Sequence, residues 1–184
     1  MISNPTISDL CLLKYSQLLR CSGEKVEKGY SCIGLVNPKN ADNVGSVLRA
    51  AGCYDSHVVF YTGQRYGYAR EFSTDTKSAA HALPLISVDD LKSVIPTDCT
   101  PVAIELVEGA QPLTEYKHPE RAFYIFGPED GSVPKSVMAW CQEVVYVPTK
   151  GCMNLAATAN VVLYDRLQKG TVHGKPWGPK STES

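Results

Sequence analysis

The 184-residue sequence lacks any apolar run approaching the about 18 residues that a transmembrane helix needs, so no membrane association is expected. Its first residues also lack the basic start and apolar stretch of a secretory signal, so we expect no signal peptide. The formal net charge is −1. The chain as a whole therefore does not favour a nucleic acid, and any surface that binds one must be local.

The cysteines lack the patterns that indicate disulfides or zinc. Their number, seven, is odd, and no two have the C-x-x-C spacing. Neither a disulfide framework nor a metal site is therefore expected. Reduced thiols in the cytoplasm are the simplest interpretation. The cysteines are Cys11, Cys21, Cys32, Cys53, Cys99, Cys141 and Cys152.

Short apolar runs alternate with segments of helical pattern along the chain. Because the runs are continuously apolar, they predict buried strands of a parallel sheet with helices on both faces, an α/β fold. We expect one domain over 1–184, with an N-terminal extension at 1–29 and a flexible tail at 171–184. The expected strands are 31–36, 56–61, 100–106, 121–126 and 143–147. The expected helices are 8–20, one within 37–52, 88–95, 134–141 and 154–169, with a short one near 75–81 in an otherwise loop-like segment 62–81.

The segment "NPKNADNVGSVLRAAG" (37–52) follows the first predicted strand and carries two helical stripes. One stripe is apolar and predicts a core face. The other contains Asp42, Gly45, Ser46 and Arg49. Asp42 is the expected N-cap. Arg49 is either a solvated surface arginine or a contact for an anion such as a phosphate, and the small residues beside it favour the second interpretation.

Three predicted strand ends carry glycine and polar residues: 37–45, 127–133 and 148–154. Ligands of parallel α/β sheets bind at the carboxyl edge, so these segments predict a site there. None matches the glycine-rich nucleotide loops. Glu129 either caps the amides of Ser132 or Val133, or orients a ligand or Asn43. Asn154 either only caps the last helix or also contributes to the site.

Three motifs occur in a characteristic order: N-x-G-x-x-x-R, then G-P-E, then V-P followed by M-N-L. From about Cys32 to Lys169 the sequence resembles the SpoU (TrmH-like) class of the SPOUT superfamily of RNA methyltransferases. The resemblance implies a C-terminal trefoil knot, bound S-adenosylmethionine and a homodimer with the site near the subunit interface. It also implies methylation of a ribose 2′-hydroxyl in transfer or ribosomal RNA.

Carried over by position, the resemblance makes Arg49 the catalytic residue, with Asn43, Glu129 and Asn154 beside it. It implies cofactor contacts from Ile104, Gly127, Val147, Cys152, Met153 and Leu155. Two positions depart from the family pattern. Cys152 stands where the family usually has serine, and Ser132 where it commonly has glycine, so the turn around Ser132 is expected to differ.

The segment 63–72 interleaves basic and aromatic residues, a combination that binds single-stranded RNA through phosphate contacts and stacking. The candidates are Arg65, Tyr66, Tyr68 and Arg70. The alternative is an ordinary loop that packs its own tyrosines. A weaker candidate lies in the tail, at Lys169, Lys175, Trp177 and Lys180.

Two alternatives to a ribose methyltransferase stay open from the sequence. One is an RNA-binding dimer that has lost catalysis, against which the intact Asn43, Arg49, Glu129 and Asn154 speak. The other is a small-molecule methyltransferase on the same scaffold, which the absence of an additional RNA-binding domain keeps open.

Overall fold

A computed structural model describes residues 29–71 and 83–170 of the chain. Within them, a single parallel sheet has the strand order β3-β2-β1-β6-β4-β7-β5. The predicted parallel sheet is therefore confirmed. The strands are β1 (Ser31–Leu35), β2 (Val59–Tyr61), β3 (Leu85–Ser87), β4 (Thr100–Ile104), β5 (Gln111–Pro112), β6 (Ala122–Phe126) and β7 (Glu143–Tyr146). Of these, β3 and β5 were not predicted, since they are too short to produce an apolar run.

Strand β6 occupies the centre of the sheet because every one of its residues is apolar and buried. Tyr124 of β6 lies opposite Ile33 of β1 on one side and Val102 of β4 on the other. Both neighbours precede β6 in the chain. The later strand β6 thus lies between the two earlier strands β1 and β4, and the sequence pattern does not predict this order.

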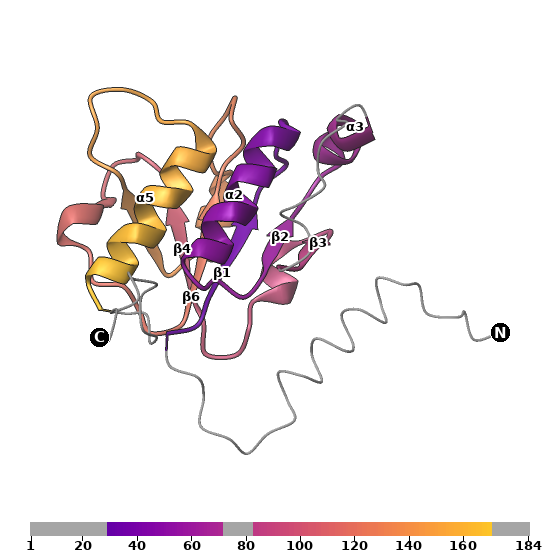
Figure 1. Cartoon of the computed structure of the whole chain (residues 1–184). Coiled ribbons are helices and arrows are strands. Elements are labelled where there is room, and N and C mark those ends of the chain that lie inside the picture. The colour runs from indigo at the N-terminus through magenta and orange to yellow at the C-terminus, as the bar shows by residue number, and fades with distance from the viewer. Residues whose placement is uncertain (1–28, 72–82, 171–184) are drawn as a thin grey trace, which may run out of the picture.

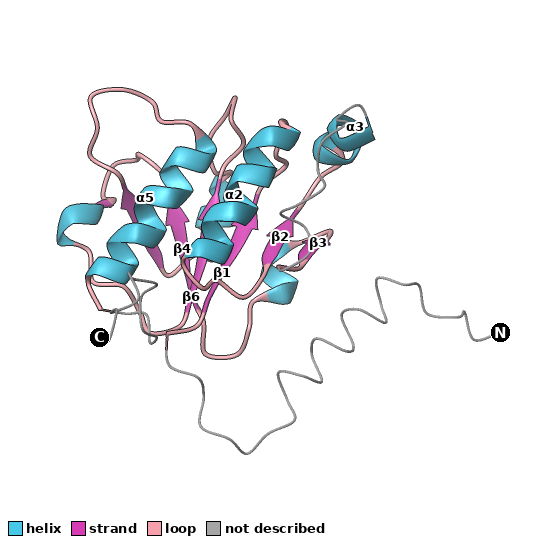
Figure 2. Ribbon diagram, viewed as in Figure 1, coloured by secondary structure: helices cyan, strands magenta, loops and turns pink. Residues whose placement is uncertain are grey.

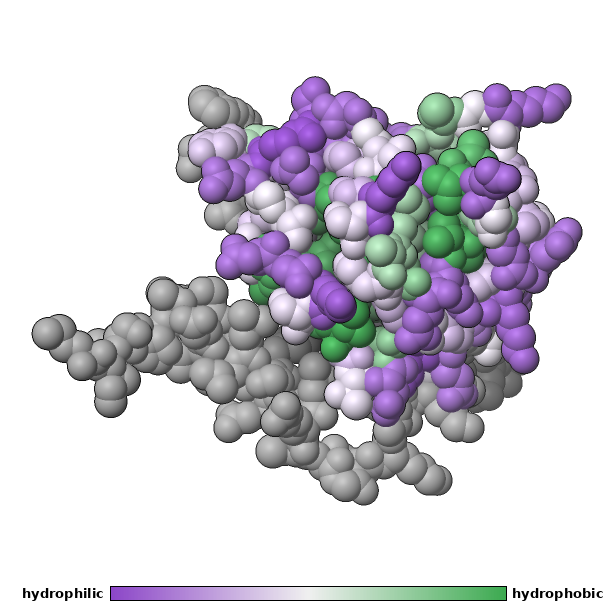
Figure 3. All heavy atoms as spheres, turned by 180° about the vertical axis from the view of Figure 1, so that it is seen from behind, coloured by the Kyte–Doolittle hydropathy of each residue, from purple (hydrophilic) through white to green (hydrophobic). Residues whose placement is uncertain are grey.

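Helices cover both faces of the sheet, as predicted. Helices α2 (Ala41–Cys53) and α5 (Leu155–Gln168) lie side by side on one face (Figure 1). The opposite face is covered by the short helix α4 (Lys135–Met138) and the 3-10 turn η1 (Leu91–Val94). A second 3-10 turn, η2 (Leu113–Glu115), precedes β6 (Figure 2). Viewed from behind, hydrophilic residues dominate the surface and hydrophobic ones gather in separate areas (Figure 3).

Several predicted boundaries were wrong. The N-cap of α2 is Asn40 and not Asp42, because the Asn40 side chain accepts hydrogen bonds from the amides of Asp42 and Asn43. The predicted helix 88–95 is only the turn η1. The predicted loop contains helix α3 (Arg65–Glu71), set apart from α2 in Figure 1. The expected helices at 8–20 and 75–81, and the tail, lie outside the described residues.

Helix α5 is anchored at both edges of the sheet. At its amino end Asn154 is the N-cap and accepts from the amides of Ala156 and Ala157. Near its other end the buried Arg166 donates to the backbone oxygens of Tyr30 and Glu120, which precede β1 and β6. Because a helix of this length spans about 21 Å, α5 runs from the carboxyl edge of the sheet to its amino edge.

A buried hydrogen-bonded network surrounds the Arg166 anchor. Arg166 Nη1 donates to the Tyr124 hydroxyl (3.1 Å), which lies 2.6 Å from His118 Nδ1, while His118 Nε2 lies 2.9 Å from Asp165. The Tyr124 hydroxyl can therefore donate to Nδ1 and His118 can donate to Asp165. Burial lowers the pKa of His118, and this outweighs the opposing effect of Asp165. The folded protein thus holds a neutral imidazole.

We predict that stability falls as the pH drops from about 6.5 towards the lowered pKa of His118 in the folded protein. In this pH window His118 is protonated in the unfolded chain but stays neutral in the folded one. One such site lowers the free energy of unfolding by at most about 1.4 kcal/mol per pH unit. Urea unfolding at a series of pH values measures the slope. A His118→Asn variant should show a shallower slope, and an identical slope in both proteins would contradict the assignment.

Candidate active site

The predicted polar residues of the three strand-end segments meet at the carboxyl edge of the sheet. Asn43 Nδ2 donates to Glu129 Oε1 (3.0 Å), and Asn154 Nδ2 donates to Asn43 Oδ1 (2.9 Å). Glu129 belongs to the segment after β6, Asn43 to the first turn of α2, and Asn154 precedes α5. We call these three residues the polar triad. Since Glu129 is an acceptor, it fixes the orientation of the Asn43 amide, which in turn fixes that of Asn154.

Glu129 also holds the backbone ahead of α2. Its Oε2 accepts from the amide of Lys39 (2.8 Å) and its Oε1 from the amide of Asn40 (3.1 Å). Partial burial acts to raise the pKa of Glu129, but the hydrogen bonds from Asn43, Lys39 and Asn40 outweigh it and hold the pKa below its usual value. The side chain is therefore a carboxylate at neutral pH. It orients Asn43, as one sequence interpretation proposed, and does not cap Ser132 or Val133.

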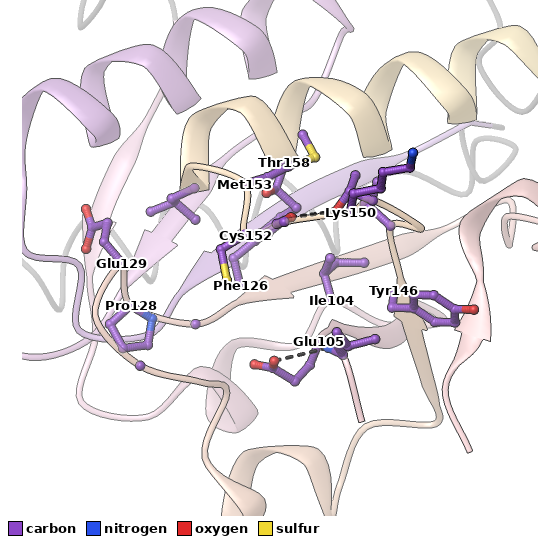
Figure 4. Close-up of a pocket in the computed structure, with 17 residues that line it drawn as sticks. Ile104, Glu105, Phe126, Pro128, Glu129, Tyr146, Lys150, Cys152, Met153 and Thr158 are labelled. Carbon is purple, nitrogen blue, oxygen red and sulfur yellow. Dashed lines mark hydrogen bonds between the residues drawn. The ribbon is translucent and has the colours of Figure 1, made fainter. Parts of the chain in front are cut away.

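A pocket of about 400 Å³ opens beside the polar triad. The last residues of β4, β6 and β7 and the segments that follow them line it, together with the first turns of α5 (Figure 4). Glu129 lies towards one end of the pocket, and Tyr146 and Lys150 towards the other. All six residues proposed as cofactor contacts line it: Ile104, Gly127, Val147, Cys152, Met153 and Leu155. Cys152 is exposed and has a free thiol.

Glu105 is a pocket residue that sequence reasoning missed. Its Oε2 accepts from the amide of Val133 (2.7 Å) and its Oε1 from that of Leu106 (3.1 Å). The carboxylate therefore ties the end of β4 to the segment after β6. Its place at the end of a predicted strand, on the edge where ligands bind, was the available signal.

The segment after β6 is folded tightly on itself. A Cβ atom on Gly127 would lie 2.7 Å from the Val133 amide nitrogen and 2.8 Å from the Ser132 carbonyl carbon. Only glycine permits this approach, because the clash would be with backbone atoms that cannot rotate away. The effect of serine at position 132, in place of the family's glycine, stays a prediction.

Arg49 is not brought to the pocket. It lies on the exposed side of α2, six residues and about 9 Å along the helix axis from Asn43. No hydrogen bond or ion pair connects its side chain to another residue in the described ranges. The neighbouring Gly45 has open space around it, since no atom lies within 4 Å of an added Cβ. The helical stripe that contains Gly45 and Arg49 is therefore accessible, but it lies on an outer surface and not at the pocket.

The four candidate RNA contacts separate in the structure. Tyr66 is 4% exposed and packs its ring edge-on against Tyr61, with 5.0 Å between ring centroids, so its prediction as an RNA contact was wrong. Arg65 forms an ion pair with Asp130, in which Nη2 donates to both carboxylate oxygens, and Tyr68 is 61% exposed. Arg70 is in α3, and its side chain lies outside the description.

Neither a metal site nor a membrane span occurs in the described residues. No group of three His, Cys, Asp or Glu side chains there could hold a metal ion. No helix in 29–71 or 83–170 is long and apolar enough to cross a membrane.

Comparisons with known proteins agree with this fold. The sequence model of the SpoU rRNA Methylase family matches residues 31–164. No curated protein sequence matches significantly. Among solved structures, the SpoU methyltransferase AviRb from Streptomyces viridochromogenes, in complex with AdoMet, superposes with a TM-score of 0.66 at 17% identity. That match covers 79% of this chain and 59% of AviRb, so the chain spans less than two thirds of AviRb.

Two further structures are similar. The A. aeolicus TrmH/SpoU tRNA modifying enzyme has a TM-score of 0.60 and 16% identity, over 86% of this chain and 84% of that one. A protein whose structure gives insights into the 2-OH methylation of C/U34 on tRNA has a TM-score of 0.61 and 19% identity, over 83% of this chain and 95% of that one. At these identities the likeness shows a shared fold and no more.

We predict that Glu129→Gln destabilises the fold. Glutamine retains one acceptor oxygen but turns an NH₂ group towards one of the three N–H donors that Glu129 now accepts. Because the site is partly exposed to water, we expect a loss of about 1 kcal/mol in the free energy of unfolding. Chemical denaturation measures it, with Glu108→Gln, an exposed acid beyond the pocket, as the matched control. Equal stability of both variants would refute the role of the carboxylate.

Proposed function

The chain belongs to the SpoU rRNA methylase family, and on this premise we propose that it is an S-adenosylmethionine-dependent RNA methyltransferase. We propose a ribose 2′-hydroxyl of transfer or ribosomal RNA as the acceptor. The observation that carries the proposal is that all six candidate cofactor contacts line one pocket, next to the polar triad.

The pocket fits the proposed cofactor chemically. Its volume lies within the range of small-molecule sites, about 300–1,000 Å³. Ile104, Phe126 and Leu155 supply apolar surface for an adenine ring. Glu105 supplies acceptors for ribose hydroxyls, since each of its oxygens, already accepting one amide, keeps a lone pair. Cys152, in place of the family's serine, still packs and is a weak donor.

Bound S-adenosylmethionine supplies an electrophilic methyl group on a positively charged sulfur. The protein's own task is to position the acceptor hydroxyl in line with that methyl group and to manage the hydroxyl proton. The polar triad holds three segments of the pocket edge in fixed relation, which suits the first requirement. We assign the second to Arg49, either as a base assisted by a neighbouring RNA phosphate or as a cation that stabilises the developing oxyanion.

We also propose that the protein is a homodimer. Arg49 does not line the pocket, so a single chain does not bring it to the reacting atoms. Helix α5 exposes Val161 and Tyr164, and the Tyr164 ring packs edge-on against Tyr54 at the end of α2. An outer surface of this kind favours a second copy of the chain. The second copy would also bring its own Arg49 to the shared interface.

We further propose the trefoil knot that the family resemblance implies, although knotted chains are rare. Two observations support it. Strand β6 inserts between β1 and β4, which both precede it. After β7 the chain returns across the sheet so that Asn154 bonds to Asn43, 111 residues earlier.

The five cysteines in the described ranges are free thiols, in keeping with the proposed cytoplasmic location.

The site of methylation provides the test. RNA is labelled with tritiated methyl groups by the full chain and then hydrolysed in alkali, which cleaves only next to a free 2′-hydroxyl. We predict label in alkali-resistant dinucleotides. Label in mononucleotides would place the methyl group on a base. RNA binding without any transfer would favour the inactive RNA-binding alternative, and transfer to small nucleosides but not to RNA would favour a small-molecule enzyme.

Arg49→Ala is predicted to abolish methyl transfer while leaving the fold and cofactor affinity nearly unchanged. The reason is that Arg49 is exposed and does not line the pocket. Calorimetry with S-adenosylmethionine and a tritium transfer assay measure the two properties. Lys92→Ala removes an exposed cation from η1 and should keep full activity. If Arg49→Ala lost cofactor binding together with activity, a structural role would replace the catalytic one.

A further inference from the structure

Two cations from separate segments converge on one exposed carboxylate beside the pocket. Arg65 Nη2 of α3 lies 2.9 and 2.8 Å from the two oxygens of Asp130. Lys39 Nζ, from the segment ahead of α2, lies 3.5 Å from Asp130 Oδ2. The hydrogen bonds from Arg65 are the main reason that the pKa of Asp130 is lowered, so this side chain is an anion at neutral pH. The cluster holds two positive charges against one negative charge.

The two cations are held near each other by contacts that do not involve Asp130. The Asn37 amide donates to Thr62 Oγ1 (3.2 Å), which joins the segment ahead of α2 to the one ahead of α3. Gly63 has a φ of +77°, and a Cβ on it would lie 2.2 Å from Asn37 Oδ1. The two segments are therefore in close contact two residues from each cation. Asp130 is not needed to bring Lys39 and Arg65 together.

Asp130 also contributes little to folding. The side chains of Arg65, Asp130 and Lys39 are 33%, 49% and 62% exposed. Ion pairs this accessible add little to stability, because water and salt screen them. Arg65 makes this contact through Nη2 alone, and a guanidinium nitrogen donates to phosphate oxygens as it does to carboxylate oxygens. The contact that Arg65 makes with Asp130 is therefore one that a phosphate can take over.

The cluster is placed at the edge of the pocket. Asp130 lies between Glu129 and Gly131, and both of these line the pocket. Glu129 in turn accepts from the Lys39 amide, so the backbone of Lys39 is fixed to the same edge. The exposed Tyr68 lies one helical turn beyond Arg65 on α3, where it could stack on a base. An anion bound here would lie beside whatever enters the pocket.

We propose that Lys39 and Arg65 form a binding site for a backbone phosphate of the RNA substrate, and that Asp130 occupies the position of this phosphate in the free protein. The inference rests on the proposed RNA methyltransferase function and names one subsite of it. RNA binding then exchanges one anion for another: the phosphate accepts hydrogen bonds from Arg65, and the carboxylate of Asp130 turns to water.

This exchange predicts effects of opposite sign from the two partners of one ion pair. Asp130→Asn removes the competing anion and should tighten RNA binding about fivefold, the effect of one unit charge about 4 Å away in water. Arg65→Ala and Lys39→Ala should weaken it by a similar factor. Arg65→Ala and Lys39→Ala should each also make the slope of log affinity against log salt concentration less steep by about one, because each removes one phosphate contact. A purely structural ion pair would instead make Asp130→Asn and Arg65→Ala change affinity in the same direction.

The experiment is fluorescence anisotropy of the full chain with a labelled single-stranded RNA of mixed sequence and with bulk transfer RNA, at several salt concentrations. Asp89→Asn, which removes an exposed acid ahead of η1, controls for net charge and should change affinity much less than Asp130→Asn. Thermal unfolding should show all four variants folded, since none of the affected side chains is buried. Unchanged or weaker binding by Asp130→Asn, or an equal gain by Asp89→Asn, would overturn the proposal.

Two further measurements keep the outcomes separate. A wild-type protein that binds S-adenosylmethionine but neither RNA would reject the proposed RNA substrate and this subsite with it. A wild-type protein that binds RNA, with Asp130→Asn no tighter, rejects the subsite alone. Calorimetry with inorganic phosphate should show no saturable binding. Saturable phosphate binding that Arg65→Ala abolishes would assign the two cations to a free anion and overturn the assignment to RNA.

Discussion

The carboxylate of Glu129 is the constraint on which the carboxyl edge of the sheet depends. It accepts three N–H groups, from Lys39, Asn40 and Asn43, and so positions the start of α2 relative to β6. Asn43 passes this constraint to Asn154, and Asn154 begins α5. Segments from the beginning, middle and end of the described chain are thereby joined within one short chain of hydrogen bonds.

The hydrogen bonds of Glu129, Asn43 and Asn154 also fix the shape of the pocket edge. Loops at a sheet edge are free to move unless side chains hold them, and a site that must align two reactants cannot tolerate such motion. Glu129 holds one end of the pocket, while Glu105 fixes the segment after β6 through the Val133 amide. The Arg166 anchor holds the far end of α5. Acidic side chains here therefore act mainly as acceptors for backbone amides, and the cations that we assign to RNA lie outside the pocket.

The sequence supported the long strands and the two main helices, because continuous apolar runs and a helical stripe are local signals. It also placed the motif residues at one edge, since carboxyl ends of parallel strands converge there. Local signals could not reveal α3, because "RYGYARE" contains a glycine and no helical apolar stripe. Its helix is held by the packing of the buried Tyr66 against Tyr61, which is a tertiary contact. Asn40 and Asp42 are equally good N-caps in isolation, and only the structure shows that the Asn40 side chain accepts from the amides of Asp42 and Asn43 while its own amide is held by Glu129.

The central claim is that the edge held by Glu129 is a preformed site for S-adenosylmethionine. Titration calorimetry of the full chain with this cofactor tests it most directly, beside a Gly127→Ala variant whose added methyl group would push against the Val133 and Ser132 backbone. The account predicts saturable binding at one site per chain in the wild type and loss of that binding in the variant, with circular dichroism unchanged. Absence of saturable binding by the wild type, or equal affinity in the two proteins, would contradict it.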